Sequence, residues 1–272
     1  MATKVEQKIT ESFLTKVESS GYLPWQRPWE LRDNQNAISH HEYRGMNRLM
    51  TSLSSYACPY WISYKKAIEN GGQVNKGEKG TPIIFLGTGK DRKNDDKSYS
   101  FLRYYTVFNL EQTTLPIPEL ADSQEKLIEL DITDNARLPR ITFGGSRAFY
   151  APGRDEVTIP YLAQYANSAE FYSTLFHELI HSTGHHSRLD RLQIVNPANM
   201  TSESYSFEEL VAEIGAAILC SKTGNYDKQA EDNSIAYVRG WKSRLANNQD
   251  WLIRAASQAE KAVDYILNTE RN

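Results

Sequence analysis

The hexapeptide Phe176-His177-Glu178-Leu179-Ile180-His181 lies within residues 168–184, a run whose apolar residues recur at the spacing of an α-helix. His177 and His181 are four residues apart, so their imidazoles share one helix face, about one turn apart. Two imidazoles placed in this way can bind one zinc ion, and Glu178 can act as general base for a water molecule at the metal. The spacing therefore predicts a zinc peptidase site; the alternative is two ordinary histidines on a half-buried helix.

The ends of this predicted helix carry residues with known capping preferences. Ser168 can accept a hydrogen bond from the first turn, and Gly184 can adopt the left-handed conformation just past the last turn. We therefore expect the helix to begin and end at these two residues.

A catalytic zinc ion needs a third protein ligand and one open coordination position. His185 and His186 follow the helix, but a metzincin-type turn would place its ligand at position 187, where this chain has Ser187. That route to a third ligand is therefore unfavourable. The same two histidines, or Tyr205, are candidates for stabilising an oxyanion during peptide hydrolysis.

Residues 206–220 predict a second helix, rich in apolar and small residues that permit close packing. Glu209 and Glu213 share one of its faces, because they are four residues apart. If this helix lies across the first, Glu209 can be the third ligand and Glu213 can orient a ligand histidine. A capping box formed with Ser206 is the alternative role for Glu209.

Length and composition indicate a globular protein. The 272 residues, 40% hydrophobic and 24% charged, are enough for one large or two modest domains. Residues 1–120 hold 16 Lys and Arg against 13 Asp and Glu, while the remainder holds 15 against 21, so the front half permits nucleic-acid binding. Two cysteines cannot form a disulfide framework and no apolar run reaches membrane-spanning length, so we expect a cytoplasmic protein without a membrane partner.

The front half combines aromatic segments with basic turns. Residues 22–29 hold two tryptophans and an arginine in a proline-rich extended stretch, which can stack bases or simply plug the core. Residues 73–80 predict a glycine-rich turn whose lysines can hold a phosphate, or a plain solvated turn. Residues 99–110 predict a strand with Arg103 and Tyr105 on one face, either a platform for single strands or an ordinary two-sided strand.

The remaining periodicity predicts an α+β protein. Helices are expected over residues 3–19, 46–56, 61–70, 232–247 and 250–267, and strands over 81–86, 140–143, 147–151 and 156–160. Residues 87–98 are expected to form a polar loop, and strand 156–160 an edge beside the active-site helix that can add an extended peptide. The expected organisation is a mixed helix and antiparallel-sheet domain over 1–118, a linker over 119–130, and a second domain over 131–272 closed by the last two helices.

Six stretches form an ordered set that spans almost the whole chain. They are residues 24–29 (PWQRPW), 43–47 (YRGMN), 72–82 (GQVNKGEKGTP), 104–109 (YYTVFN), 177–181 (HELIH) and 208–213 (EELVAE). Together they resemble the ArdC-type antirestriction proteins of conjugative plasmids and their primase-associated relatives.

The resemblance implies an N-terminal domain that binds single-stranded DNA and a C-terminal zincin-like metallopeptidase domain with an active-site helix. It also implies protection of entering plasmid DNA from restriction during conjugation, with zinc, or another divalent ion such as Mn²⁺, as cofactor. In related gluzincin-like domains the third ligand is a glutamate about this far past the second histidine, which supports Glu209. The candidate contacts to single strands are Trp25, Arg27, Trp29, Arg44, Lys76, Lys79, Arg103 and Tyr105.

Two alternatives stay open. The metal site can be structural or vestigial, so that protection comes from coating DNA without proteolysis. The N-terminal domain can instead recognise a protein, in which case single strands would show no salt-dependent affinity. The sequence leaves the oligomeric state and any protein substrate open.

Overall fold

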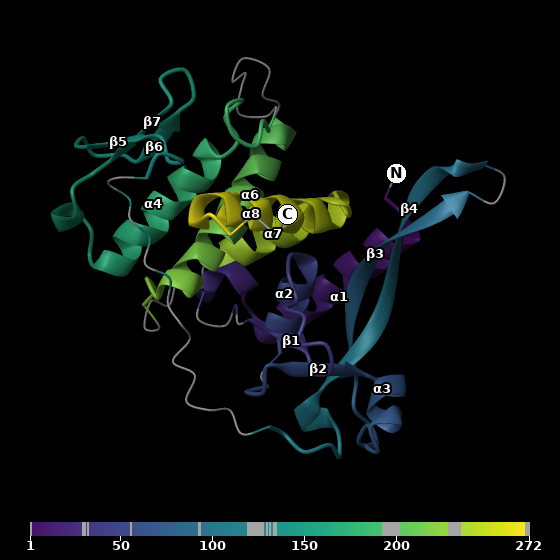
Figure 1. Ribbon diagram of the computed structural model, residues 1–272. Coiled ribbons are helices and arrows are strands. Elements are labelled where there is room, and N and C mark those ends of the chain that lie inside the picture. The colour runs from purple at the N-terminus through teal and green to yellow at the C-terminus, as the bar shows by residue number, and fades with distance from the viewer. Residues whose placement is uncertain are drawn as a thin grey trace. The chain divides into compact units, whose positions relative to one another are not determined.

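The structure, a computed structural model, describes residues 2–28, 31, 33–54, 56–91, 94–118, 128, 130, 132, 135–191, 202–227 and 235–269 (Figure 1). Trp29 and most of the expected linker, residues 119–130, lie outside this described part. Helices and strands occur in both halves of the chain, so the α+β prediction is confirmed. Within the described ranges, no helix has both the length and the apolar composition that crossing a membrane requires.

Contacts divide the chain into two compact units that interleave in sequence. The first unit comprises Met1–Tyr22, Arg32–Asp122 and Ile235–Asp250, and the second unit comprises Leu23–Leu31, Ser123–Ser234 and Trp251–Asn272. This division differs from the two contiguous domains that the sequence predicted. The packing of one helix shows why: α7 (Ile235–Asn247) lies against α1 (Lys4–Ser20), and Lys242 Nζ is 3.3 Å from Glu18 Oε1.

Helix α1 forms as its sequence predicts. Thr3 and Glu6 make a capping box at its start. Gly21, with φ of 80°, ends it in the left-handed conformation that glycine adopts without strain. The apolar residues that recur every four positions and are fully buried are Ile9, Phe13 and Val17.

The first unit contains a four-stranded sheet in the order β1-β2-β4-β3. Its strands are β1 (Gln35–Asn36), β2 (Tyr60–Ser63), β3 (Thr81–Asp91) and β4 (Asn94–Asn109), and two short helices are α2 (Met46–Ser52) and α3 (Tyr64–Glu69). The helix expected over 61–70 is wrong in its first part, because Trp61 and Ile62 are buried in β2, which pairs with β4. The loop expected over 87–98 is also wrong, because β3 and β4 remain paired as far as Asp91 and Asn94.

The second unit contains a three-stranded sheet in the order β5-β7-β6. Its elements are β5 (Arg140–Phe143), β6 (Phe149–Ala151), β7 (Glu156–Ile159), α4 (Ser168–Ser182), α6 (Ser202–Thr223) and α8 (Trp251–Leu267). Strand β7 is central, so the expectation that residues 156–160 form the edge is wrong. Because β7 pairs in parallel with β5 and antiparallel with β6, the edge strand that lies beside the site is β6.

Helices α4 and α6 pack closely enough to face each other's side chains. A Cβ added at Gly215 of α6 would lie 2.7 Å from Cδ1 of Ile180 in α4, so this approach needs a glycine. Helix α4 begins at Ser168 as predicted, but its capping residue is Asn167 rather than Ser168, and it ends at Ser182. Gly184 is not among the described glycines with positive φ, so the predicted left-handed end is wrong. Asn167 caps the start by accepting a hydrogen bond from Glu170 N–H, and Thr183, in right-handed helical conformation, follows the last residue.

Candidate metal centre

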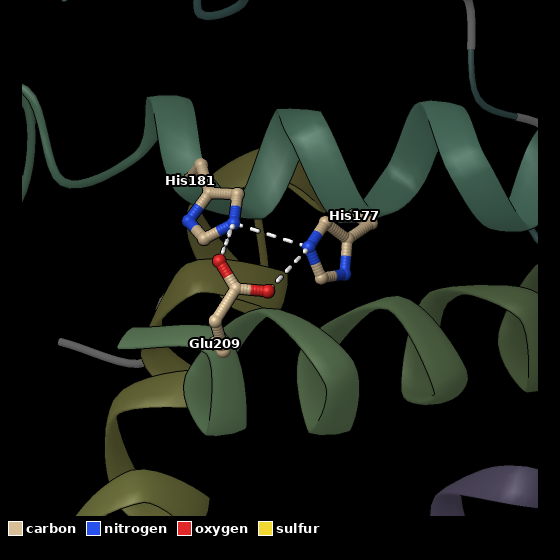
Figure 2. Close-up of side chains that lie close together, drawn as sticks. All are labelled: His177, His181 and Glu209. Atoms are coloured by element: carbon tan, nitrogen blue, oxygen red, sulfur yellow. Dashed lines mark hydrogen bonds and ion pairs between the residues drawn. The ribbon is translucent and has the colours of Figure 1, made fainter. Parts of the chain in front are cut away.

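Three side chains from α4 and α6 converge on one point (Figure 2). The Nε2 atoms of His177 and His181 are 3.1 Å apart. The two carboxylate oxygens of Glu209 face different histidines: Oε2 is 3.4 Å from Nε2 of His177, and Oε1 is 3.4 Å from Nε2 of His181. The ligand atoms all lie within 4.8 Å of one another. Two imidazole nitrogens and a carboxylate fit a divalent cation such as zinc, so the structure brings together the three residues that the sequence selected.

The position of Glu209 within α6 decides between its two possible roles. The helix begins at Ser202, four residues before Ser206, so Ser206 and Glu209 both lie inside it. A capping box requires its serine at the helix start. The capping role is therefore excluded, and the side chain of Glu209 is directed at the two histidines.

Charge in the cluster favours a bound cation. Burial disfavours the imidazolium form of His181, but hydrogen bonds and charge from Glu208 and Glu209 outweigh burial and raise its pKa to about 9. Burial likewise opposes ionisation of Glu209, yet both histidines together hold its pKa below the ordinary value. In the metal-free protein, these shifts therefore favour a protonated His181 at neutral pH, and a metal ion would have to displace that proton.

Glu208 fixes His181 from behind, a role that the sequence analysis missed. Its carboxylate is only 2% exposed and lies 3.4 Å from Nδ1 of His181. Arg191 donates to both oxygens of Glu208, at 2.7 and 3.1 Å, and to the carbonyl oxygen of Ile180 at 2.8 Å. Glu213, which we expected to orient a ligand histidine, lines a cavity together with His177. In the sequence, the one indication of the contact between Glu208 and His181 is that Glu208 directly precedes Glu209.

The expected general base is held by the backbone of the edge strand. Glu178 Oε2 accepts a hydrogen bond of 2.8 Å from the N–H of Tyr150 in β6. Glu178 and the three candidate ligands line a cleft of about 450 Å³. A backbone amide has no side-chain signature, so sequence reasoning could not have found this partner.

An ion pair between the buried Arg188 and the part-exposed Asp155 positions that strand. Arg188 donates to both oxygens of Asp155, at 2.8 and 2.7 Å, and to the carbonyl oxygen of Ser182 at the end of α4. Tyr150 O–H donates to Asp155 at 2.8 Å. Together these bonds join the β6–β7 connection to α4, which keeps the Tyr150 amide beside Glu178.

The three candidates for stabilising an oxyanion, Tyr205, His185 and His186, differ in whether they line the cleft. Tyr205 lines the cleft, and the charge of Glu209, with burial second, raises its pKa, so its hydroxyl stays protonated. His185 instead pairs with the hydroxyl of Ser187 at 2.8 Å, and its ring lies 4.0 Å from that of His186. Neither His185 nor His186 is among the described residues that line the cleft.

The expected contacts to single strands are scattered over both units. Trp25 is only 4% exposed and belongs to the second unit, so its ring is not available to stack on a base. Arg27 also belongs to the second unit and is half-buried, as is Arg44 of the first unit. The expected contacts that are exposed on the first unit are Lys76, Lys79, Arg103 and Tyr105.

One face of the β3–β4 hairpin carries a row of exposed rings, which we call the aromatic face. Its members are Phe85, Tyr99, Phe101, Arg103 and Tyr105. Phe85, Tyr99 and Tyr105 are 42 to 55% exposed, and the guanidinium of Arg103 lies 4.7 Å from the centre of the Phe101 ring. Gly87 and Gly89 lie opposite Phe101 and Tyr99, whose rings occupy the space that a Cβ would need. The sequence analysis identified Arg103 and Tyr105 on this face. It missed Phe85, near the end of the expected strand 81–86, and Tyr99, the first residue of the expected strand 99–110.

Comparisons with known proteins agree with this architecture. Residues 3–108 match the family described as the N-terminal domain of anti-restriction factor ArdC, and residues 131–258 match the family of zincin-like metallopeptidases. DNA primase TraC of Escherichia coli is 32% identical over 97% of this chain, which spans only 20% of the primase.

Solved structures extend the match to the whole chain. The Mn(II)-bound crystal structure of antirestriction ArdC protein from R388 plasmid is 32% identical, covers 98% of both chains and has a TM-score of 0.76. The metal-free structure of the same protein is also 32% identical, covers 99% of this chain and 100% of its own, and has a TM-score of 0.73. The chain therefore belongs to the ArdC family of antirestriction proteins and carries its N-terminal domain together with a zincin-like metallopeptidase domain.

Proposed function

We propose that this protein protects incoming plasmid DNA during conjugation by binding single strands and by hydrolysing peptide bonds at a divalent metal centre. The observation that carries the hydrolytic part is the convergence of His177, His181 and Glu209 beside Glu178 (Figure 2). The two cysteines, Cys58 and Cys220, are both free, which suits the reducing cytoplasm where such protection would operate.

A divalent cation held by the cluster would act as a Lewis acid toward the substrate carbonyl. Zinc suits two imidazoles and a carboxylate, and the related ArdC structure with Mn(II) makes manganese a second choice. Glu178 takes the proton from the attacking water and returns it to the leaving amine, while the Tyr150 amide holds its carboxylate in place. The Tyr205 hydroxyl donates to the carbonyl oxygen as negative charge develops on it.

The aromatic face is the proposed platform for single strands. Exposed rings stack on bases of any sequence, and a nearby guanidinium can pair with phosphate. Arg103 lies within this face, and Lys76 and Lys79 are exposed in the turn that precedes β3. A duplex keeps its bases stacked internally, so the face should prefer single strands.

Fluorescence anisotropy with single-stranded and duplex oligonucleotides at two salt concentrations tests the DNA part. We expect a preference for single strands, weakened by salt, and a loss of about tenfold in Tyr99→Ala. Tyr64→Ala is the matched control, because Tyr64 is 56% exposed in the first unit but lies outside the aromatic face. Equal losses in both variants, or tighter binding to duplex, would refute the platform.

The variant Glu178→Gln tests the hydrolytic part. It should bind metal as the wild type does and lose all peptide hydrolysis, because the amide cannot accept the proton of water. Unaltered cleavage would rule out this mechanism.

A second candidate function is DNA coating with a structural metal. The observation in its favour is that the cluster joins α4 to α6, so a bound cation would also link two helices. In that case Glu178→Gln would keep full protection against restriction in conjugation, while His181→Ala would lower thermal stability in the presence of metal.

A further inference from the structure

One amine of the first unit, that of Lys16 on α1, is half-buried at the start of β3. Its Nζ donates a hydrogen bond of 3.1 Å to the hydroxyl oxygen of Thr81. Among the residues that the structure describes, Lys16 has no ion-pair partner. The positions one turn away on α1 are uncharged: Ser12, Phe13, Ser19 and Ser20. A cation in such a place is unfavourable unless a ligand supplies the opposite charge.

Within the described ranges, the neighbours of α1 bring no negative charge to this amine. Helix α7, which contacts α1, has no Asp or Glu along its length, and its Lys242 already pairs with Glu18 at 3.3 Å. In the turn before β3, the carboxylate of Glu78 accepts a hydrogen bond of 2.7 Å from Nε2 of Gln112. Burial therefore acts alone on the amine, and it lowers the pKa of Lys16 to about 8.

Lys16 lies at the inner end of the aromatic face. The side chains of Thr81 and Phe85 are on the same side of β3, but Thr81 is 3% exposed and Phe85 is 52% exposed. Because α1 contacts β3 and β4 (Figure 1), the face is covered at Thr81, where Lys16 meets it, and open from Phe85 onward. The titratable groups between them on β4, Arg103 and Tyr105, add no negative charge, because burial raises the pKa of Tyr105. At 3.3 Å per residue the two ends are roughly 13 Å apart, a distance that a few nucleotides can span.

We propose that Lys16 binds a backbone phosphate of the single strand whose bases stack on the aromatic face. The inference rests on the proposed binding of single strands, and it adds where the strand meets the body of the first unit. The phosphate supplies the negative charge that the described surroundings of Lys16 do not provide, so binding favours the charged amine. Lys79, two residues before Thr81, is exposed and offers a second cation at the same end.

Fluorescence anisotropy of the full chain with a labelled deoxyadenosine oligonucleotide, whose bases do not titrate between pH 7 and pH 9, tests this contact. With a pKa of about 8, the charged fraction of Lys16 falls about tenfold over this range, so the affinity should fall by the same factor. In Lys16→Arg the affinity should stay level, because a guanidinium keeps its proton. An equal fall in wild type and Lys16→Arg would overturn the proposal.

Lys16→Met keeps an unbranched apolar side chain and removes the charge. At pH 7 it should bind the oligonucleotide about tenfold more weakly, because one charged hydrogen bond is lost. Its slope of log affinity against log salt should be shallower by about 0.7, the contribution of one phosphate contact on a single strand. Lys8→Met, which removes the charge of an exposed lysine on the same helix, should keep the fall in affinity between pH 7 and pH 9.

Thermal unfolding separates binding from a structural role. At pH 7 Lys16→Met should melt at or above the Tm of the wild type, because burial disfavours the ammonium group that it removes. A lower Tm with unchanged DNA affinity would make Lys16 a structural residue and overturn the proposal. A salt slope and pH dependence that survive Lys16→Met would also overturn it while leaving the aromatic face intact. Failure of the wild type to bind single strands would refute the platform and this contact together.

Discussion

Metal binding to this protein should compete with a proton on His181. In the metal-free protein Glu208 and Glu209 raise the pKa of His181 to about 9, so its imidazole is protonated at pH 7. A metal ion binds only the neutral ring, so binding at pH 7 must release about one proton per site. Because pH 7 lies about two pH units below this pKa, the apparent affinity should rise about fiftyfold by pH 9 and level off above it at about a hundredfold gain.

Calorimetry with chelator-buffered zinc measures this competition. Titrations in two buffers of different ionisation enthalpy give the number of protons released, and a pH series gives the affinity. An affinity that stays constant from pH 7 to pH 9, with no proton released, would show that His181 is neutral before the metal binds and would refute the electrostatic argument.

The variant Glu208→Gln separates two effects of the same carboxylate. Removing its charge lowers the pKa of His181, so the affinity should level off at a lower pH than in the wild type. Above that pH the affinity should be about 10- to 100-fold weaker, because the group that fixes Nδ1 of His181 has been changed. Glu203→Gln, on the exposed face of the same helix, should change neither quantity.

Three further predictions concern stability. The pKa of His181 is raised from 6.5 to about 9 by folding, so this stabilisation of the metal-free protein is complete below pH 6.5 and is lost as pH rises through 9. The loss amounts to about 3 kcal/mol, visible as a falling Tm that saturating metal should abolish. Because the Trp25 ring is buried, Trp25→Ala should lower the free energy of unfolding by about 3–5 kcal/mol in denaturant titrations. The affinity for single strands should stay unchanged. Weaker DNA binding at unchanged stability would contradict this prediction. Asp155→Asn should cost about 2 kcal/mol at neutral pH, because Arg188 loses a charged partner. The pKa of Asp155 is lowered, so its contribution exists above the ordinary carboxyl pKa and fades in acid, where Tm values of variant and wild type should converge.

The elements that local pattern predicted well are those with strong periodicity and caps. Helix α1 has apolar residues every four positions and a glycine at its end, and it forms where expected. Pattern failed where pairing with another segment decided the outcome. The apolar run at Trp61 and Ile62 reads as either helix or strand, and it is a strand because β4 pairs with it. The glycines at 87 and 89 suggested a loop, yet they lie in β3 because rings of the opposite strand cover them.

The metal centre shows the same distinction between what local spacing decides and what packing decides. The placement of His177, Glu178 and His181 on one helix follows from spacing alone, because the α-helix sets the positions of side chains four residues apart. Local spacing cannot say which carboxylate of a second helix meets them. Packing of α4 against α6 brings Glu209 to the histidines and places the buried Glu208 and Arg191 behind His181. It also places Glu213 in the wall of a cavity that His177 lines.

The partners contributed by the backbone and by distant segments were accessible only through the tertiary structure. The group of Tyr150 that bonds Glu178 is its backbone N–H, which every residue except proline has, so residue type does not indicate this role. Trp25 reads equally well as an exposed stacking ring or a buried plug, and the fold decides for burial within the metallopeptidase unit. Residue type and spacing specify which chemistry is possible, whereas burial and contact depend on segments far apart in the chain, because apolar surface is removed from water only when those segments pack together.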